Sequence, residues 1–174
     1  MNKDQEILVK SIHSIVNIDG FDLNYGDMKY ILSNMIAKFT NRGKIYLSEK
    51  TKNELLLRDF KIGGEIKYKN MFYGKNCKFY KKHKIIFVVD HVIPCGVILK
   101  MILESDRTLN KIVEILLLNV VVMLLKDEDN ELNKMGYRIN VNENFTINNI
   151  WGRYEDVGIK VTESYFEDIG TIFR

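Results

Sequence analysis

The sequence contains few of the residues that build cross-linked or segmented proteins. It has two cysteines, Cys77 and Cys95, among 174 residues, which excludes a multi-disulfide scaffold and a four-cysteine zinc site. Pro94 is the only proline, and no stretch rich in proline, glycine or serine marks a linker between domains. At this length, the absence of a linker favours one compact domain.

A long hydrophobic run is also missing. The longest apolar stretch, residues 115–125, contains Asn119 and is too short to cross a bilayer. The first ten residues carry charges before any apolar stretch begins, unlike a signal peptide. These features predict a cytoplasmic protein without a membrane anchor. The 46% of hydrophobic and 28% of charged residues are typical of a globular protein and argue against disorder.

The charged residues are distributed unevenly along the chain. The net charge is only +3, but residues 61–84 contain eight lysines and one acid, with five aromatic residues between them. Such a segment is typical of a surface that follows a nucleic-acid backbone and stacks rings on bases. The alternative is that these lysines keep an exposed sheet edge soluble and at least half of the rings belong to the core. The lysines predicted to bind nucleic acid are Lys67, Lys69, Lys75, Lys78, Lys81, Lys82 and Lys84.

The order of apolar patterns predicts an α+β fold. Helical spacing covers residues 4–18 and 28–39, and Thr51 with Glu54 forms a capping-box pattern before a short helix. Later segments are expected to be extended at 65–74, 77–94 and 120–125, helical at 97–104, 109–118 and 126–136, and short strands and turns after that. We therefore expect a helical part over residues 1–60 and an α+β core with a C-terminal extension over residues 61–174.

The most informative residues are an acid and a histidine at the end of an apolar strand. Residues 85–89 are all apolar, Asp90 and His91 follow directly, and Pro94 then stops regular structure. An imidazole that titrates near neutral pH can accept a proton from water, and a carboxylate can bind a divalent cation. The alternative is that Asp90 and His91 are turn-forming or hydrogen-bonded structural residues.

Residues 85–136 resemble the HNH endonucleases of the ββα-metal fold. The matching features are the strand that ends in Asp90-His91, the Ile93-Pro94 pair after it, Asn119 just before the next apolar strand, and a polar helix after that strand. The resemblance implies a ββα-metal-like core with additional short strands. This sequence lacks the paired Cys-x-x-Cys motifs of many members, has a longer and more apolar insertion after His91, and has no histidine after His91.

The resemblance also implies roles for individual residues. His91 is expected to be the general base that activates water, and Asn119 is expected to orient it. Asp90 and a residue of the polar helix, either Asp129 or Asn133, are expected to hold one Mg²⁺ or Mn²⁺ ion. These roles predict metal-dependent hydrolysis of nucleic acid, most simply of DNA, in a restriction or other defence system.

A second hypothesis is a non-catalytic interaction protein, such as an immunity or host-interaction factor. Its basis is the apolar content of residues 97–125, which exceeds the need of a small nuclease core and predicts helices that present a binding groove. The sequence leaves the oligomeric state open, and a homodimer is compatible with it. Two other residues are given structural roles: Cys95 is expected to turn inward, and Arg153 to pair with Glu155 or Asp156 on the surface.

Overall fold

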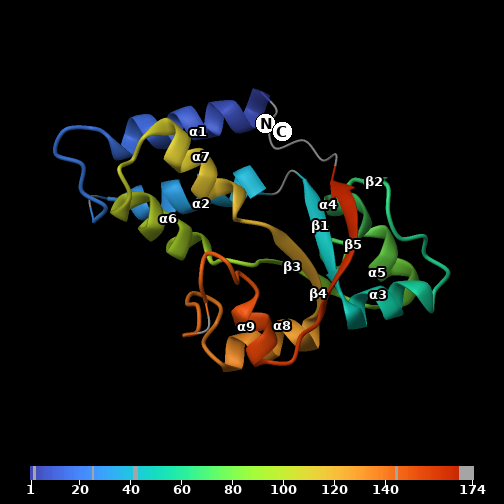
Figure 1. Cartoon of the computed structure of the whole chain (residues 1–174). Helices are drawn as coiled ribbons and strands as arrows, with labels where there is room; N and C mark the ends of the chain where they lie inside the picture. Colours follow the sequence, from blue (N-terminus) through green and yellow to red (C-terminus); the bar gives the residue numbers. More distant parts are fainter. Residues whose placement is uncertain (2, 25, 41–42, 144, 169–174) are drawn as a thin grey trace.

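Within the described residues, five strands form one mixed sheet at the centre of the molecule (Figure 1). The computed structural model describes residues 1–168 apart from residues 2, 25, 41, 42 and 144. The strand order is β2-β5-β1-β4-β3. The strands are β1 (Lys44–Ser48), β2 (Glu65–Ile66), β3 (Phe87–His91), β4 (Val121–Leu125) and β5 (Val161–Asp168).

The central strands β1 and β4 are parallel, whereas β3 is antiparallel to β4 and β5 is antiparallel to β1. Residues 121–124 of β4 are all buried, which explains why this strand is continuously apolar rather than alternating. Because β1 and β4 are parallel, they end at the same edge of the sheet. A helix begins directly after each of them: α3 (Glu49–Leu56) after β1 and α8 (Lys126–Lys134) after β4.

A buried carboxylate joins the starts of these two helices. Glu128, only 3% exposed, accepts a hydrogen bond from the Ser48 hydroxyl at 2.6 Å and from the Leu125 backbone N–H at 3.0 Å. The Ser48 oxygen in turn accepts from the Thr51 N–H at 3.1 Å, so α3 begins at an N-cap serine three residues before the predicted capping box. The Glu128 carboxylate thus accepts hydrogen bonds from polar groups at the N-terminal ends of both α3 and α8.

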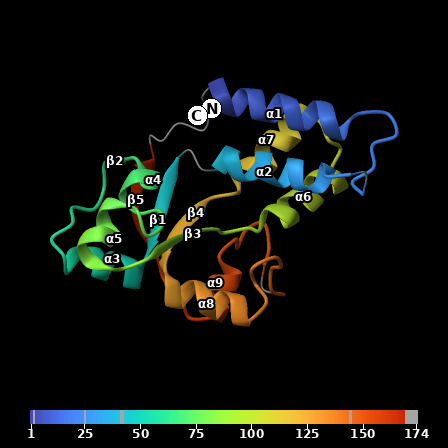
Figure 2. The same ribbon diagram turned by 180° about the vertical axis from the view of Figure 1, so that it is seen from behind.

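Four helices pack together beside the sheet: α1 (Lys3–Val16), α2 (Met28–Thr40), α6 (Cys95–Glu104) and α7 (Leu109–Leu117). Figures 1 and 2 show this helical group next to the end of the sheet where β3 leads into α6 and α7 leads into β4. The apolar faces of α6 and α7 are buried against α1 and α2 in one core. The apolar content of residues 97–125 is therefore accounted for by the packing of this core and of β4.

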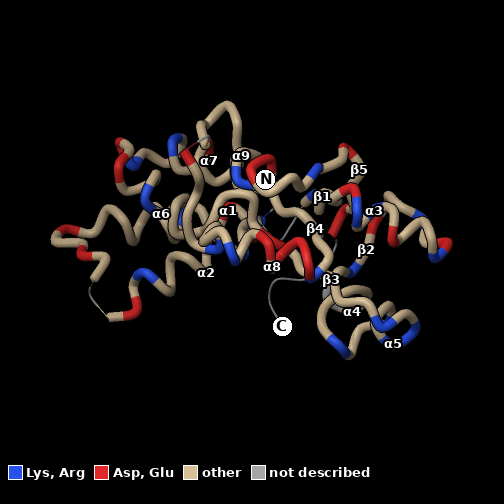
Figure 3. Tube along the Cα trace, turned by 90° about the horizontal axis from the view of Figure 1, so that it is seen from below, with Lys and Arg blue, Asp and Glu red and all other residues tan. Residues whose placement is uncertain are grey.

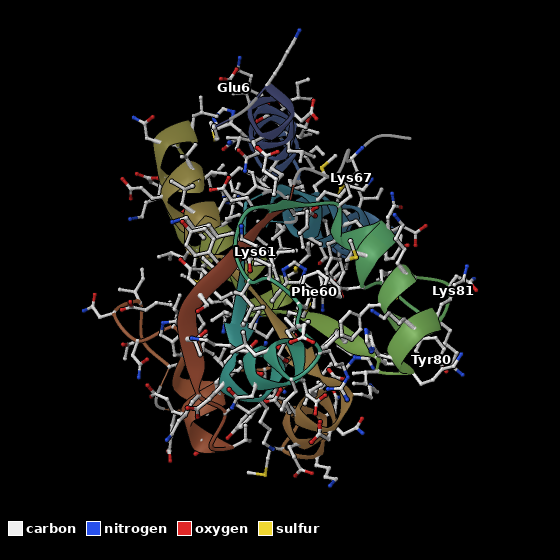
Figure 4. All side chains as sticks on the ribbon, turned by 90° about the vertical axis from the view of Figure 1, so that its right-hand side faces the viewer. Glu6, Phe60, Lys61, Lys67, Tyr80 and Lys81 are labelled. Atoms are coloured by element: carbon white, nitrogen blue, oxygen red, sulfur yellow. The ribbon has the colours of Figure 1, made fainter. Side chains whose placement is uncertain are left out.

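The two faces of the sheet are covered by different elements. On one face lie α3, α4 (Tyr68–Met71) and α5 (Lys78–His83). Phe60 contacts three other rings of this core, at centroid distances of 5.2 to 6.1 Å, and Figure 4 shows it pointing into the interior. On the other face lie α8 and α9 (Gly152–Asp156), which bury Leu132 and Tyr154.

The segment before β3 is helical where extended chain was predicted over residues 65–74 and 77–84. Only Glu65–Ile66 is a strand, and α4 and α5 follow it. The Cys77 thiol caps α5 by accepting from the Tyr80 N–H at 3.3 Å, and Lys84 ends the helix in the left-handed conformation, with φ of 60°. These local caps, together with the burial of Phe79, decide the structure of a segment whose alternating lysines and aromatic residues indicated strands.

The α+β class is confirmed, with N-terminal helices and a mixed sheet whose strands alternate with helices along the chain. The packing of α1 and α2 against α6 and α7 joins parts of the chain on either side of residue 60. Among the described helices, none has the length and apolarity that a bilayer crossing requires.

Candidate functional site

Two of the candidate residues, Asp90 and His91, occupy the C-terminal end of β3. Asp90 lies opposite Val122 of β4 and His91 opposite Val121, so their side chains leave opposite faces of the sheet. Strand β4 then leads directly into α8. The chain therefore contains an antiparallel strand pair followed by a helix, in the order that the sequence predicted for this region.

Asp90 is held by two residues from α9. Its Oδ2 atom accepts a hydrogen bond from the Tyr154 hydroxyl at 2.7 Å and another from the Arg153 guanidinium. Burial raises the pKa of Asp90 above its usual value, the positive charge of Arg153 and the Tyr154 hydrogen bond act to lower it, and the negative charge of Asp129 raises it further. The Asp90 side chain is still 22% exposed, so water reaches the carboxylate.

Arg153 is a buried structural residue rather than a surface one. It is 1% exposed, and its Nε donates to the Val92 carbonyl at 2.9 Å. Its Nη atoms donate to the carbonyl oxygens of Tyr137 and His91 as well as to Asp90. The predicted surface pair with Glu155 or Asp156 was therefore wrong, because the guanidinium turns inward to satisfy carbonyl groups at the end of β3.

His91 and Asn119 lie together, as predicted. Burial is the largest cause that lowers the pKa of His91 to about 4, and the charge of Arg153 lowers it as well, whereas a hydrogen bond with the Asn119 side chain raises it. Asn119 is 4% exposed and lies two residues before β4. The imidazole is therefore neutral at pH 7.

Cys95, at the start of α6, shares the Asn119 interaction but is not an activated nucleophile. Burial raises the pKa of its thiol to about 11, although a hydrogen bond with Asn119 lowers it. At neutral pH the group is therefore a thiol rather than the reactive thiolate. The half-buried position of Cys95 fits the structural role predicted for it.

The two helix residues proposed as metal ligands lie in different places. Asp129 is 16% exposed, pairs with Lys126, and is close enough to Asp90 for its charge to raise the pKa of that carboxyl. Asn133 is exposed and lines a shallow depression on the outside of α8 together with Asp127, Asn130, Glu131 and Lys134. Of the two, Asp129 is the residue that the structure brings toward Asp90.

Asp90 and Asp129 are the two carboxylates at this position that could bind a metal ion. In the part of the chain that the structure describes, no group of three or more histidine, cysteine, aspartate or glutamate side chains is placed to hold a metal. Asp90 and Asp129 are two partly exposed acids, and the charge of Asp129 acts on the pKa of Asp90. Mg²⁺ is commonly held by one or two carboxylates, with water and substrate phosphate as its other ligands. Two carboxylates therefore fit a Mg²⁺ ion, which keeps several water ligands, better than a metal ion that takes all of its ligands from the protein.

The basic segment forms a surface unit of its own, the α4–α5 unit (residues 67–84). Figure 3 shows lysine and arginine around α4 and α5 and acidic residues along α8. The side chain of Lys69 lies outside the described part of the structure, and the other lysines predicted to bind nucleic acid are all exposed. Phe72 and Phe79 are buried in the core, whereas Tyr73 is 64% exposed, so only some of the rings are available at the surface.

Comparisons with known proteins give no match: no protein-family model, no curated protein and no solved structure matches this chain. The functional argument therefore depends on the geometry at the end of β3. Sequence reasoning missed the role of Arg153 and did not consider Tyr154 as a partner of Asp90. The available signal was an arginine within a segment of otherwise apolar and aromatic residues, 150–154, where a charge needs an internal partner.

Proposed function

We propose that this protein is a metal-dependent endonuclease of the HNH type that hydrolyses phosphodiester bonds in DNA. The observation that supports the proposal is the arrangement around the end of β3, where His91 lies with Asn119 on one face of the sheet and Asp90 lies near Asp129 on the other, on two antiparallel strands followed by a helix. Each residue has the chemical character that the reaction needs. Asp90 is also reachable by solvent.

His91 is the proposed general base. Its imidazole is neutral at pH 7, and Asn119 fixes one side of the ring. A pKa of about 4 gives a weak base, but a phosphate group next to the imidazole would raise that pKa, because a negative charge favours the protonated form. Substrate binding would therefore move His91 toward the range in which general-base catalysis is effective.

Asp90 and Asp129 are the proposed metal-binding pair. When bound, Mg²⁺ or Mn²⁺ would offset negative charge on the scissile phosphate and the leaving oxygen. Tyr154 and Arg153 both contact Oδ2 of Asp90, so Oδ1 is the oxygen that would meet the ion. The Arg153 charge also favours the ionised form of Asp90 against the burial that opposes it.

The α4–α5 unit is the proposed DNA-binding surface. His91 alternates along β3 with Phe87 and Val89, which belong to the core under α4 and α5, so the imidazole and the α4–α5 unit share one side of the sheet. His91 lies seven residues after Lys84, a separation of roughly 20 Å in extended chain. That length corresponds to roughly six nucleotides along one strand of B-DNA.

The hypothesis of a helical interaction protein receives no comparable support. It depended on apolar helices that present a groove, but Ile98, Leu99, Ile102, Ile112, Ile115 and Leu116 are buried in the core of the helical group. These six residues therefore pack in the core with α1 and α2 rather than lining a groove, whereas Leu109 and Leu117 of α7 are exposed.

The test is cleavage of supercoiled plasmid DNA by the full chain, with Mg²⁺ or Mn²⁺ and with EDTA as the metal-free control. We expect metal-dependent nicking that falls by about 10²- to 10⁴-fold in His91→Ala, the usual contribution of a general base. Asp129→Asn should require more metal for the same rate. His13→Ala, a matched substitution in α1 at a distance from the site, should leave the rate unchanged. Wild-type protein that cleaves neither plasmid nor RNA with either metal would overturn the proposal, as would full activity of His91→Ala.

A further inference from the structure

A shallow hollow between α4 and α5 combines the groups that recognise an unpaired base. Its volume is about 460 Å³, and its lining is Asn70, Tyr73, Gly74, Lys75, Asn76 and Cys77. Tyr73 supplies an exposed aromatic ring, the two asparagines supply amide donors and acceptors, and Lys75 supplies a positive charge. Aromatic faces stack on bases of any sequence, and amides can pair with base edges.

Tyr73 is presented by a fixed part of the fold. Its backbone forms a β-bridge to Phe87 at the start of β3, and the edge of its ring contacts Tyr68 at a centroid distance of 6.4 Å and an interplanar angle of 63°. The next residue, Gly74, turns the chain with φ of 70°, a conformation that favours glycine. Although its neighbour Phe72 is 1% exposed, Tyr73 is 64% exposed. The ring is thus held in place and still open to solvent.

The charges around the hollow favour a polyanionic strand. Lys67 and Lys78 are exposed on either side of it along the chain, and Lys81 extends outward from α5 in Figure 4. Glu65 is the only acid between residues 61 and 84. In a duplex, bases stack on one another and do not offer a free face to a protein ring. A strand that uses both Tyr73 and the lysines must therefore be unpaired where it crosses the hollow.

We propose that the hollow binds an unpaired nucleotide of single-stranded DNA, with the base stacked on Tyr73 and the phosphates on the surrounding lysines. The inference deepens the proposed function, because it assigns a single-stranded segment to the substrate at the α4–α5 unit. Binding does not require catalysis, so the two proposals fail independently.

The test is fluorescence anisotropy of the full chain with a labelled single-stranded oligonucleotide and with its duplex, both in EDTA so that no cleavage occurs. We expect tighter binding of the single strand and a loss of about fivefold to 150-fold in Tyr73→Ala, as for removal of one base–ring stack. Tyr73→Phe keeps the ring and should bind as the wild type does. Tyr30→Ala removes an equally exposed tyrosine, 72% exposed, from α2 in the helical group, and should also have no effect.

Three results would overturn the inference: no binding of the single strand by the wild type, equal affinity for single strand and duplex, or unchanged affinity in Tyr73→Ala. None of them depends on plasmid cleavage. A circular dichroism spectrum that matches the wild type shows that Tyr73→Ala is folded.

Discussion

Replacing Tyr154 with phenylalanine should destabilise the protein in a pH-dependent manner. The substitution keeps the buried ring and removes only the hydroxyl that donates to Asp90 Oδ2 at 2.7 Å. A hydrogen bond to a charged group contributes about 1.5–3 kcal/mol to stability, and one between neutral groups about 0.5–1.5 kcal/mol. The free energy of unfolding should therefore fall more when Asp90 is ionised than when it is protonated.

The sign follows from the direction of the pKa shift. Asp90 has a raised pKa in the folded protein, so the stability that its protonated form contributes is present at low pH and is lost as pH rises through the folded pKa. Tyr154→Phe removes a group that lowers this pKa, so the pKa rises further. The difference between wild type and variant should thus be smaller near pH 3.5 than near pH 8, where it reaches about 1.5–3 kcal/mol.

The assay is urea unfolding of both proteins at pH 3.5 and pH 8, followed by circular dichroism. Tyr46→Phe is the matched control, because Tyr46 is a half-buried tyrosine of the same sheet that packs on Trp151 and Tyr165. Its effect should be the same at both pH values. Equal destabilisation by Tyr154→Phe at pH 3.5 and pH 8 would refute the reasoning that the hydroxyl stabilises the Asp90 carboxylate.

Two further predictions concern the same site. Arg153→Met should cost about 3–5 kcal/mol in urea unfolding at pH 7, because it leaves the largely buried carboxylate of Asp90 without its cation. Adding Asp90→Asn to this variant should recover part of the loss, and no recovery would contradict the pairing of Asp90 with Arg153. His91 has a pKa of about 4 in the folded protein against 6.5 in the unfolded chain, so wild-type stability should fall by up to about 3 kcal/mol as pH drops from 6.5 to 4. His91→Gln should lose that part of the pH dependence, and a pH profile identical to the wild type would show that the imidazole is not shifted.

The sequence predicts the parts of the site that depend on local pattern. Strands β3 and β4 and helix α8 follow from apolar runs next to a polar helical segment, whereas the pairing of His91 with Asn119 was expected from the resemblance of residues 85–136 to the HNH endonucleases. By contrast, Arg153 contacts Asp90 across 63 residues of sequence. Such a contact depends on how α9 packs on the sheet, and no local pattern encodes it.

In the α4–α5 unit the sequence contains a local pattern, but the pattern does not decide between strand and helix. Lysines and aromatic residues at short spacing suit an extended strand as well as a short helix. The Cys77 cap and the turn at Lys84 decide for helix. In α8, the choice between Asp129 and Asn133 depended on the rotation of the helix, since residues four apart point in similar but not identical directions.

The bonds from Arg153 to the end of β3 have a consequence for the protein during its synthesis. A ribosome that has made β3, β4 and α8 has produced every residue proposed for chemistry, yet the guanidinium that balances Asp90 has not been translated. The nascent chain therefore carries an incomplete centre until residue 154 has emerged. A fragment that stops short of this arginine would contain the proposed catalytic groups without the cation that secures them.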